Sequence, residues 1–268
     1  MSRWFGAFWG VIRRDAFVFI SYRTQLASQV LAMLFQLTIF YFISHLLHVH
    51  ATSFRDSNAY FAYVVVGLGI SQVLILTLGL APQRVRQELV AGTMERFMVS
   101  PFGVDSGVIS MLFFPILLGL LMATIMLGLA AAIFGLRLSD TAPLAIPVAA
   151  LGSVAFMPFA LGMVALVVAF KQIASGASFV TGAIGIIGGL YFPPSLLPGW
   201  LRWASQVQPF TPAVDLLRHL LVETPLQHSA ALDLVKLIGF TVVLFPPAVI
   251  MLRRSVLFGQ RRGTIFEY

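Results

Sequence analysis

Six apolar runs of about membrane-spanning length divide this sequence and leave little room for any other fold. A helix needs about 20 apolar residues to cross the hydrocarbon core of a bilayer. A window of that size selects Leu26 to Leu47, Tyr60 to Ala81, Val108 to Phe134, Leu144 to Phe170, Ile173 to Tyr191 and Leu232 to Leu252. With 59% hydrophobic and 10% charged residues, a water-soluble domain could not bury its apolar surface. We therefore predict an all-α polytopic membrane protein, a single domain over residues 1–268 with six transmembrane helices.

Prolines fall inside several of these runs, and a proline removes one backbone hydrogen bond from a helix. The positions are Pro115, Pro147, Pro158, Pro246 and Pro247. We expect the helices to kink there, because neighbouring helices can satisfy the freed backbone groups.

The first 22 residues precede any run that is long enough to span. Apolar side chains recur there at helical spacing, at Trp4, Phe5, Phe8, Trp9 and Ile12. This pattern predicts an amphipathic helix over residues 1–22 that lies in the membrane interface, with its aromatic rings at the headgroup level.

The positive charges predict the orientation. If the N-terminus is cytoplasmic, twelve of the 17 Lys and Arg residues lie in cytoplasmic segments and five lie outside. Because cytoplasmic loops carry an excess of Lys and Arg, this split places both termini in the cytoplasm. The net charge of +7 is then a record of topology, and we expect no nucleic-acid partner.

A charged stretch over residues 82–101 separates the second and third runs. Its charged side chains alternate with apolar ones at the spacing of an amphipathic helix: Arg84, Arg86, Glu88, Glu95 and Arg96 lie among Val85, Leu89, Met94, Phe97 and Met98. Gly92 and Thr93 divide the stretch, with Thr93 as the N-cap of a second short helix, and Ser100 and Pro101 close it. A solvated loop is the alternative that the residues alone leave open.

The stretch from Phe192 to Leu221 is too rich in proline to cross the membrane and too apolar for a free loop. We predict two short helices. The first runs from Pro198 to Val207 with Trp200 and Trp203 as interface anchors. The second starts at Thr211 as N-cap, with Pro212 in the first helical position and a pair between Asp215 and Arg218. From the residues alone, this segment is either a gate or a plain connection.

Both stretches resemble parts of one protein family. The segment from Arg86 to Pro101 resembles the Arg…Glu…Gly-Thr-x-Glu-x-x-x-x-Ser/Thr-Pro motif between the second and third spans of ABC-2 type permeases. Residues 192–218 are similar to the outer re-entrant region that precedes the last span of that family. Length, span number and topology agree, so the resemblance covers nearly the whole chain.

The resemblance implies a permease subunit of an ATP-driven exporter in the inner membrane of a prokaryote. Two copies of a separate ATP-binding subunit would carry ATP and Mg²⁺, a second permease chain would complete a homodimer, and lipids would surround it. This chain would need no cofactor of its own. The residues that would couple to the ATP-binding subunit are Arg84, Arg86, Glu88, Gly92, Thr93, Glu95, Arg96, Ser100 and Pro101. The outer gate would contain Phe192, Pro193, Trp200, Trp203, Phe210, Asp215 and Arg218.

Motifs for chemistry are scarce. A P-loop needs Gly-Lys-Ser/Thr, and the two lysines, Lys171 and Lys236, follow Phe170 and Val235. We see no protease or hydrolase motif, expect no catalytic or metal-binding residues, and interpret His45, His48 and His50 as interfacial histidines. An ion-coupled secondary carrier and a membrane enzyme are the other function classes considered.

The substrate is predicted from the few polar residues within the apolar runs. These are Gln36, Thr38, Ser71, Gln72, Thr77, Thr124 and Ser178. Such a lining suits an amphiphile, so we expect export of a drug, antibiotic or lipid-like molecule. Polysaccharide or glycolipid export is the alternative, although Tyr22 and Arg23 are all that this chain keeps of the basic and aromatic run typical of polysaccharide exporters.

Overall fold

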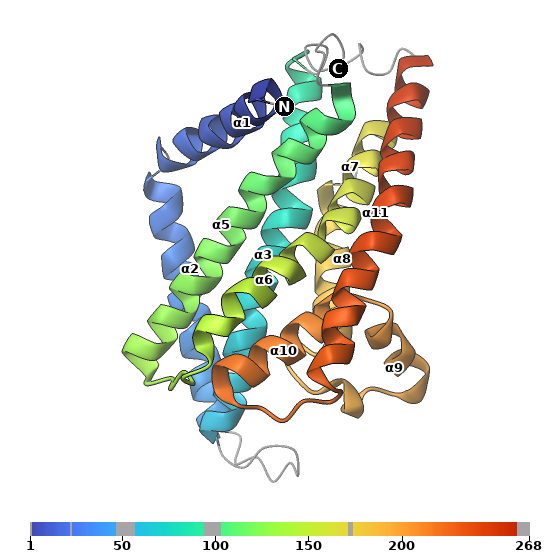
Figure 1. The fold of residues 1–268 in the computed structure, drawn as a ribbon. Helices are drawn as coiled ribbons and strands as arrows, with labels where there is room; N and C mark the ends of the chain where they lie inside the picture. Colours follow the sequence, from blue (N-terminus) through green and yellow to red (C-terminus); the bar gives the residue numbers. More distant parts are fainter. Residues whose placement is uncertain (1, 22, 47–56, 94–102, 171–173, 262–268) are drawn as a thin grey trace.

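The computed structural model describes residues 2–21, 23–46, 57–93, 103–170 and 174–261, and every regular element among them is a helix (Figure 1). The long helices form one bundle, which confirms an all-α polytopic membrane protein. The elements are α1 (Ser2–Ser21), α2 (Arg23–Leu46), α3 (Ser57–Val90), α5 (Gly103–Phe134), η1 (Ala142–Leu144), α6 (Ala145–Ala155), α7 (Met157–Phe170), α8 (Ala174–Ile187), η2 (Pro194–Leu196), α9 (Gly199–Gln206), α10 (Phe210–Val222) and α11 (Ala230–Arg261).

Helix α3 lies at the centre of the bundle. In its most apolar window 83% of the residues are buried, against 11% in α2 and in α11. A helix that is apolar all round is buried on all sides, and α3 packs against α2, α5, α7, α8 and α10. Gly119 permits the closest of these approaches, because a Cβ atom there would lie 2.6 Å from the Cα of Val73. The central helix therefore connects both ends of the molecule.

The two ends of the bundle differ. Helix α1 and the last turns of α11 lie at one end, here called the α1 end, and α9 and α10 lie at the other, here called the α9 end (Figure 1). Helix α1 confirms the helix predicted for residues 1–22, and it lies obliquely across α5 rather than along it.

Among the described residues, five stretches of helix are long and apolar enough to cross a membrane: α2, α3, α5, the run from Ala142 to Phe170, and α11. The fifth predicted span, Ile173 to Tyr191, is described from Ala174 onward, and its first residue lies outside the described residues. Helix α8 has 14 residues, which rise about 21 Å, less than the hydrocarbon thickness of about 30 Å. It ends because Gly189 adopts a φ of +90° and the Leu190 N–H donates to the Gly185 carbonyl at 2.9 Å, which closes a glycine cap.

Residues 82–90 do not form a separate helix. They continue α3 beyond the predicted end of the second span at Ala81, despite Pro82 inside the helix. Ala81, Val85 and Leu89 are buried, so packing compensates for the one hydrogen bond that the proline removes. The helix thus extends beyond the apolar span, because buried packing continues on one of its faces after Ala81.

Thr93 takes part in the cap that ends α3. Gly92 has a φ of +67°, and the Thr93 N–H donates to the Glu88 carbonyl at 3.0 Å, the pattern of a Schellman cap. The Thr93 hydroxyl also donates to the Glu88 carboxylate. The second helix that Thr93 was predicted to cap would lie in residues 94–102, outside the described residues, so this role stays a prediction. Glu95, Arg96, Ser100 and Pro101 lie outside the described residues.

The prolines have unequal effects. The predicted fourth span, Leu144 to Phe170, is split into α6 and α7 at Phe156, two residues before Pro158. By contrast, Pro115, Pro246 and Pro247 lie inside helices α5 and α11, which remain continuous. The break at Phe156 places this fully buried ring against Phe210 of α10, with 6.3 Å between ring centroids.

The two short helices predicted before the last span are present, with different boundaries. Helix α9 is preceded by Pro198 as N-cap. Helix α10 begins at Phe210, with Pro209 as N-cap and no side-chain capping bond, so Thr211 lies in the first turn and is not the cap. The start is set by tertiary packing, because Phe210 is completely buried and a Cβ atom at Gly188 would lie 2.5 Å from its ring.

Arg218 anchors α10 to the rest of the bundle. Its side chain is 3% exposed. Its guanidinium donates to three backbone carbonyl oxygens: to Tyr63 at 3.0 Å, to Gly189 at 2.9 Å and to Leu190 at 3.0 Å. It also lies 3.3 Å from the centroid of the Tyr63 ring, a cation–π contact. One side chain thus joins α10 to α3 and to the turn that follows α8.

The predicted ion pair between Asp215 and Arg218 does not form. Arg218 is directed at the three carbonyl oxygens, and the Asp215 Oδ2 atom accepts a hydrogen bond from the Gln227 N–H at 3.0 Å. Burial lowers the pKa of Arg218 to about 10, so the guanidinium stays charged at neutral pH. The spacing of three residues suggested a pair along the helix, but the available carbonyl groups lie on the neighbouring elements.

We predict that Arg218→Ala destabilises the protein. The substitution leaves a buried cavity and removes three charge-assisted hydrogen bonds, so the loss should be about 3–5 kcal/mol. A thermal melt in detergent should show a decrease of roughly 10 °C. Arg218→Lys should recover little of this loss, because an ammonium cannot reproduce the planar fork.

Arg202 is the matched control. It is exposed on α9 and also donates to two carbonyl oxygens, those of Ser195 and Leu197. Arg202→Ala should change the melting temperature by only a few degrees, because surface substitutions cost little. Equal shifts for the two variants would show that Arg218 is not the anchor.

Candidate functional site

A cluster of charges joins α1 to the extended part of α3 at the α1 end. Arg84 Nη1 lies 2.5 Å from Asp15 Oδ1, and Arg14 Nε lies 3.1 Å from the same oxygen. Arg14 Nη1 also lies 3.0 Å from Glu88 Oε1. The Asp15 side chain is 1% exposed, so its charge is compensated by two guanidinium groups within the protein, as a buried carboxylate requires.

The spacing along α3 explains this cluster. Arg84 and Glu88 are one helical turn apart and lie on the face toward α1, where the Arg84 guanidinium also covers the Phe114 ring at 5.1 Å. Val85 and Leu89 form the buried face. Arg86 lies on the opposite, exposed face. The end of α3 is therefore held on two sides and leaves a third side open.

The structure divides the predicted coupling residues into two groups. Arg84, Glu88 and Thr93 make contacts inside the chain, so Glu88 is not a free charge available to a partner. Arg86 and Gly92 are exposed. Sequence reasoning missed the contribution of α1, although Asp15 gave a signal as the one acidic residue in a basic and aromatic helix.

A second ion pair stabilises the same end. Arg253 Nε of α11 lies 2.5 Å from Asp105 Oδ2 in the first turn of α5. An acidic residue there also has a favourable interaction with the helix dipole. Neither residue was predicted to matter, because the two are 148 positions apart in the sequence and only the fold brings them together.

A cavity of about 470 Å³ lies between α2, α3 and α8. Its wall is mainly apolar, with a small number of hydroxyl and amide groups. Three of the seven polar residues highlighted in the sequence, Gln36, Ser71 and Ser178, line it. Gln83 and Thr181 add to them. An apolar wall with a few placed polar groups is typical of a ligand pocket.

A larger cavity, of about 1050 Å³, opens at the α9 end. It lies between the start of α3, the η2 region, and the segment over residues 223–229 that connects α10 to α11. The charged and polar groups on its wall include Arg202, Gln206, Asp215, Glu223 and His228. Two cavities of different character thus lie on the two sides of the Arg218 anchor.

The predicted gate residues have different surroundings. Phe210, Asp215 and Arg218 are buried, whereas the Trp200 and Trp203 side chains are 74% and 64% exposed. Phe192 and Pro193 are partly buried, and Pro193 lines the larger cavity. Tyr63 and Gly67 complete this region and were not predicted. A Cβ atom at Gly67 would lie 2.7 Å from the Leu190 carbonyl oxygen, so only glycine fits there.

The loop before η1 fixes the far end of α10. Ser139 Oγ donates to Glu223 Oε1 at 2.9 Å, and Thr141 Oγ1 donates to the Leu220 carbonyl oxygen at 2.7 Å. Glu223 itself has a φ of +56°, an uncommon conformation for a residue other than glycine. These hydrogen bonds hold the end of α10 in place beside the outer cavity.

Comparison with known proteins supports the resemblance found in the sequence. The chain is similar to Nodulation protein J from Rhizobium meliloti (strain 1021), with 27% identity over 131 residues, which are 49% of this chain and 50% of that relative. The match thus spans about half the length of the relative. Residues 6–222 match the ABC-2 type transporter family, a range that includes most of α1, the end of α3, the inner cavity and α10. The chain therefore belongs to the ABC-2 type transporter family and is a membrane component of a transport system.

Proposed function

We propose that this chain is the permease subunit of an ATP-driven exporter and works with a separate ATP-binding subunit. The observation that supports this most is the end of α3. Buried packing and the Arg84–Asp15 ion pair hold it firmly, while Arg86 and Gly92 stay exposed. A rigid helix end with a free charged face can bind the ATP-binding subunit and transmit its movement along α3, the central helix of the bundle.

We further propose that the α1 end faces the cytoplasm of a prokaryote and that the α9 end faces outward. The distribution of Lys and Arg supports this orientation, since twelve of the 17 lie in segments assigned to the α1 side. The ATP and Mg²⁺ would be bound by two copies of the ATP-binding subunit. An ion-coupled carrier is the competing proposal, and it differs in needing no such subunit.

We expect Arg86→Glu and Glu95→Arg to weaken copurification with the ATP-binding subunit. Losing one partner of a desolvated interface pair costs roughly 2–5 kcal/mol, so affinity should fall at least tenfold. Arg137→Glu is the matched control, because this exposed arginine lies in the loop after α5 at the α9 end. The melting temperatures of all three variants should stay near that of the wild type.

The opposite pattern would contradict both orientation and coupling. If Arg137→Glu weakened the complex and the other two variants did not, the motor would dock at the α9 end. Export that continues without any ATP-binding subunit, driven by an ion gradient, would favour the secondary carrier.

We propose that two copies of the chain form the working transporter. Helix α2 supports this because its large apolar side chains face away from the bundle: Leu31 is 67% exposed, Phe35 is 68% exposed and Phe42 is 59% exposed. Phe179 of α8 is 79% exposed, and α2 and α8 both border the cavity of about 470 Å³. A second copy against these helices would close the cavity into a shared path, and lipid would cover the remaining apolar faces.

We propose that the transported substrate is an amphiphile, such as a drug, an antibiotic or a lipid-like molecule. The inner cavity supports this, because hydroxyl and amide groups at Gln36, Ser71 and Ser178 interrupt an apolar wall. A polysaccharide or glycolipid is the second candidate. It fits this cavity less well, because a sugar chain would need many more polar partners than the cavity wall offers.

Filling the inner cavity should stop export of an amphiphile. Ser178→Phe places a ring in the cavity and should reduce the transport rate at least tenfold while the complex still assembles. Val242→Leu changes an exposed residue of α11 that does not line this cavity and should preserve transport. Mass spectrometry of the purified transporter should find a bound lipid or drug-like molecule, and a bound oligosaccharide would instead favour the second candidate.

We propose that α9 and the segment around η2 form a lid over the outer cavity. The two exposed tryptophans of α9 and the bends at Pro193, Pro198 and Pro209 support a short rigid element that could move as a unit. Arg218 and Phe210 would stay fixed beneath it, because both are buried in the bundle.

A cross-link tests the lid. The chain has no cysteine, so Val207→Cys, an exposed position just after α9, can be joined by a bifunctional reagent to the same position in a second copy. Locking the lid should abolish export and leave complex assembly unchanged, and cleavage of a reducible linker should restore it. Full export with the link in place would mean that the segment only connects α8 to α10.

A further inference from the structure

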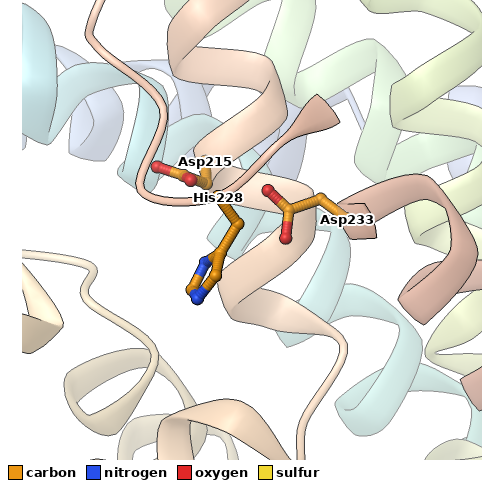
Figure 2. A group of neighbouring side chains, drawn as sticks. All are labelled: Asp215, His228 and Asp233. Atoms are coloured by element: carbon orange, nitrogen blue, oxygen red, sulfur yellow. The ribbon is translucent and has the colours of Figure 1, made fainter. Parts of the chain in front are cut away.

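Three potential metal ligands converge at the α9 end. Asp215 lies in the middle of α10, His228 lies in the connecting segment over residues 223–229, and Asp233 lies in the first turn of α11 (Figure 2). The ligand atoms of all three lie within 4.8 Å of one another. They come from three successive parts of the chain that only the fold brings together, and none of them belongs to the predicted coupling segment.

The Asp233 carboxylate is the observation that points to a ligand. Asp233 is 2% exposed, and its Oδ2 atom is buried without a hydrogen-bond partner. Figure 2 shows this carboxylate directed toward His228 and Asp215. A buried carboxylate without a partner costs several kcal/mol unless a positive group neutralises it.

Lys236 and His228 attract the Asp233 carboxylate electrostatically, but neither forms an ion pair with it in the described part of the chain. The nearest lysine on the same helix, Lys236, donates its Nζ proton to Gln206 Oε1 at 3.0 Å. Within the part of the chain that the structure describes, no Lys, Arg or His nitrogen lies within 4.0 Å of Asp233. Arg218, which is near in sequence to Asp215, is committed to three carbonyl oxygens on the other side of α10.

We propose that Asp215, His228 and Asp233 bind a divalent transition-metal ion, of which Zn²⁺ is the best match. One imidazole and two carboxylates suit zinc, whereas Mg²⁺ and Ca²⁺ select oxygen ligands alone. Three protein ligands leave a coordination position for water. Because Asp215 and His228 line the cavity of about 1050 Å³, that position faces the cavity.

The geometry needs only a small closure to receive the ion. Ligand atoms that share a tetrahedral zinc at about 2.0–2.2 Å lie about 3.4 Å apart. The three side chains must therefore approach by roughly 1.4 Å at most. His228 can supply this movement, because it lies in the segment between α10 and α11, while the Gln227 N–H already orients Asp215. A hydrogen-bonded carboxylate of this kind is a common arrangement around metal ligands.

The bound ion joins α10 to α11. Without it, hydrogen bonds attach the segment over residues 223–229 to α10 and to Ser139, and the Gln227 N–H bond to Asp215 is one of them. With the ion bound, the first turn of α11 is held against α10, the helix that carries Arg218. This clamp acts whether or not the chain is an exporter, so it does not rest on the proposed function.

Metal binding to the full-length, tag-free protein in detergent tests the site. After treatment with a chelator, titration with Zn²⁺ followed by calorimetry should show one ion per chain, and the melting temperature should rise with Zn²⁺ and not with Mg²⁺. His228→Gln and Asp233→Asn should each weaken Zn²⁺ affinity at least tenfold. Removing a residue that only hydrogen-bonds to a metal ligand already lowers affinity by roughly 10- to 100-fold, so removing a ligand should lower it at least as much. The absorption of bound Co²⁺ should change in both variants.

His219→Gln is the matched control. This histidine is exposed on α10, and its Nδ1 atom contacts the Thr224 carbonyl oxygen, outside the cluster. It should bind Zn²⁺ like the wild type. The proposal is overturned if the wild-type protein binds no Zn²⁺, or if His228→Gln binds Zn²⁺ unchanged. The His228 variant also decides the matter if Asp233→Asn fails to fold, because His228 lies outside the helices.

Discussion

The arrangement of the α9 end depends on one buried guanidinium. Arg218 satisfies carbonyl oxygens of α3 and of the turn after α8, and it covers the Tyr63 ring. In a membrane protein such a charge is costly unless every donor has a partner. The surrounding sequence makes room for it, since Gly67 leaves the space that any side chain would fill. Two residues whose carbonyl groups Arg218 contacts line the cavities, Leu190 the inner one and Tyr63 the outer one.

The α1 end follows a different principle. There the charges are paired across helices, with Asp15 between Arg14 and Arg84 and with Asp105 opposite Arg253. The first pair joins the end of α3 to α1, and the second joins the start of α5 to α11. The central helix α3 then links the two ends, because it is buried along most of its length. A displacement of its exposed tip would be transmitted as movement of a rigid rod.

The inner cavity, the proposed lid and the proposed metal cluster all lie close to α3 or to helices that contact it. The inner cavity borders α3 directly, and Arg218 connects α3 to α10. Asp215, one turn away on α10, belongs to the metal cluster that reaches α11. In the proposed mechanism, the link from α3 to α10 is made by the Arg218 hydrogen bonds, and the proposed metal ion would extend it to α11.

The sequence by itself determined that the chain is a helical membrane protein, because runs such as Tyr60 to Ala81 are too apolar and too long for any other environment. It also located the two stretches that stand out from the spans, since charge and proline are rare in apolar helices. A local pattern failed at the start of α10. Thr211 has the chemistry of an N-cap, yet the burial of Phe210 decided where this helix begins. Pairing between distant residues was decided by the tertiary structure alone. Asp15 meets Arg84, Arg218 meets Tyr63, and Asp233 meets His228 because folding brings separate helices together, and spacing along one helix carries no record of that approach.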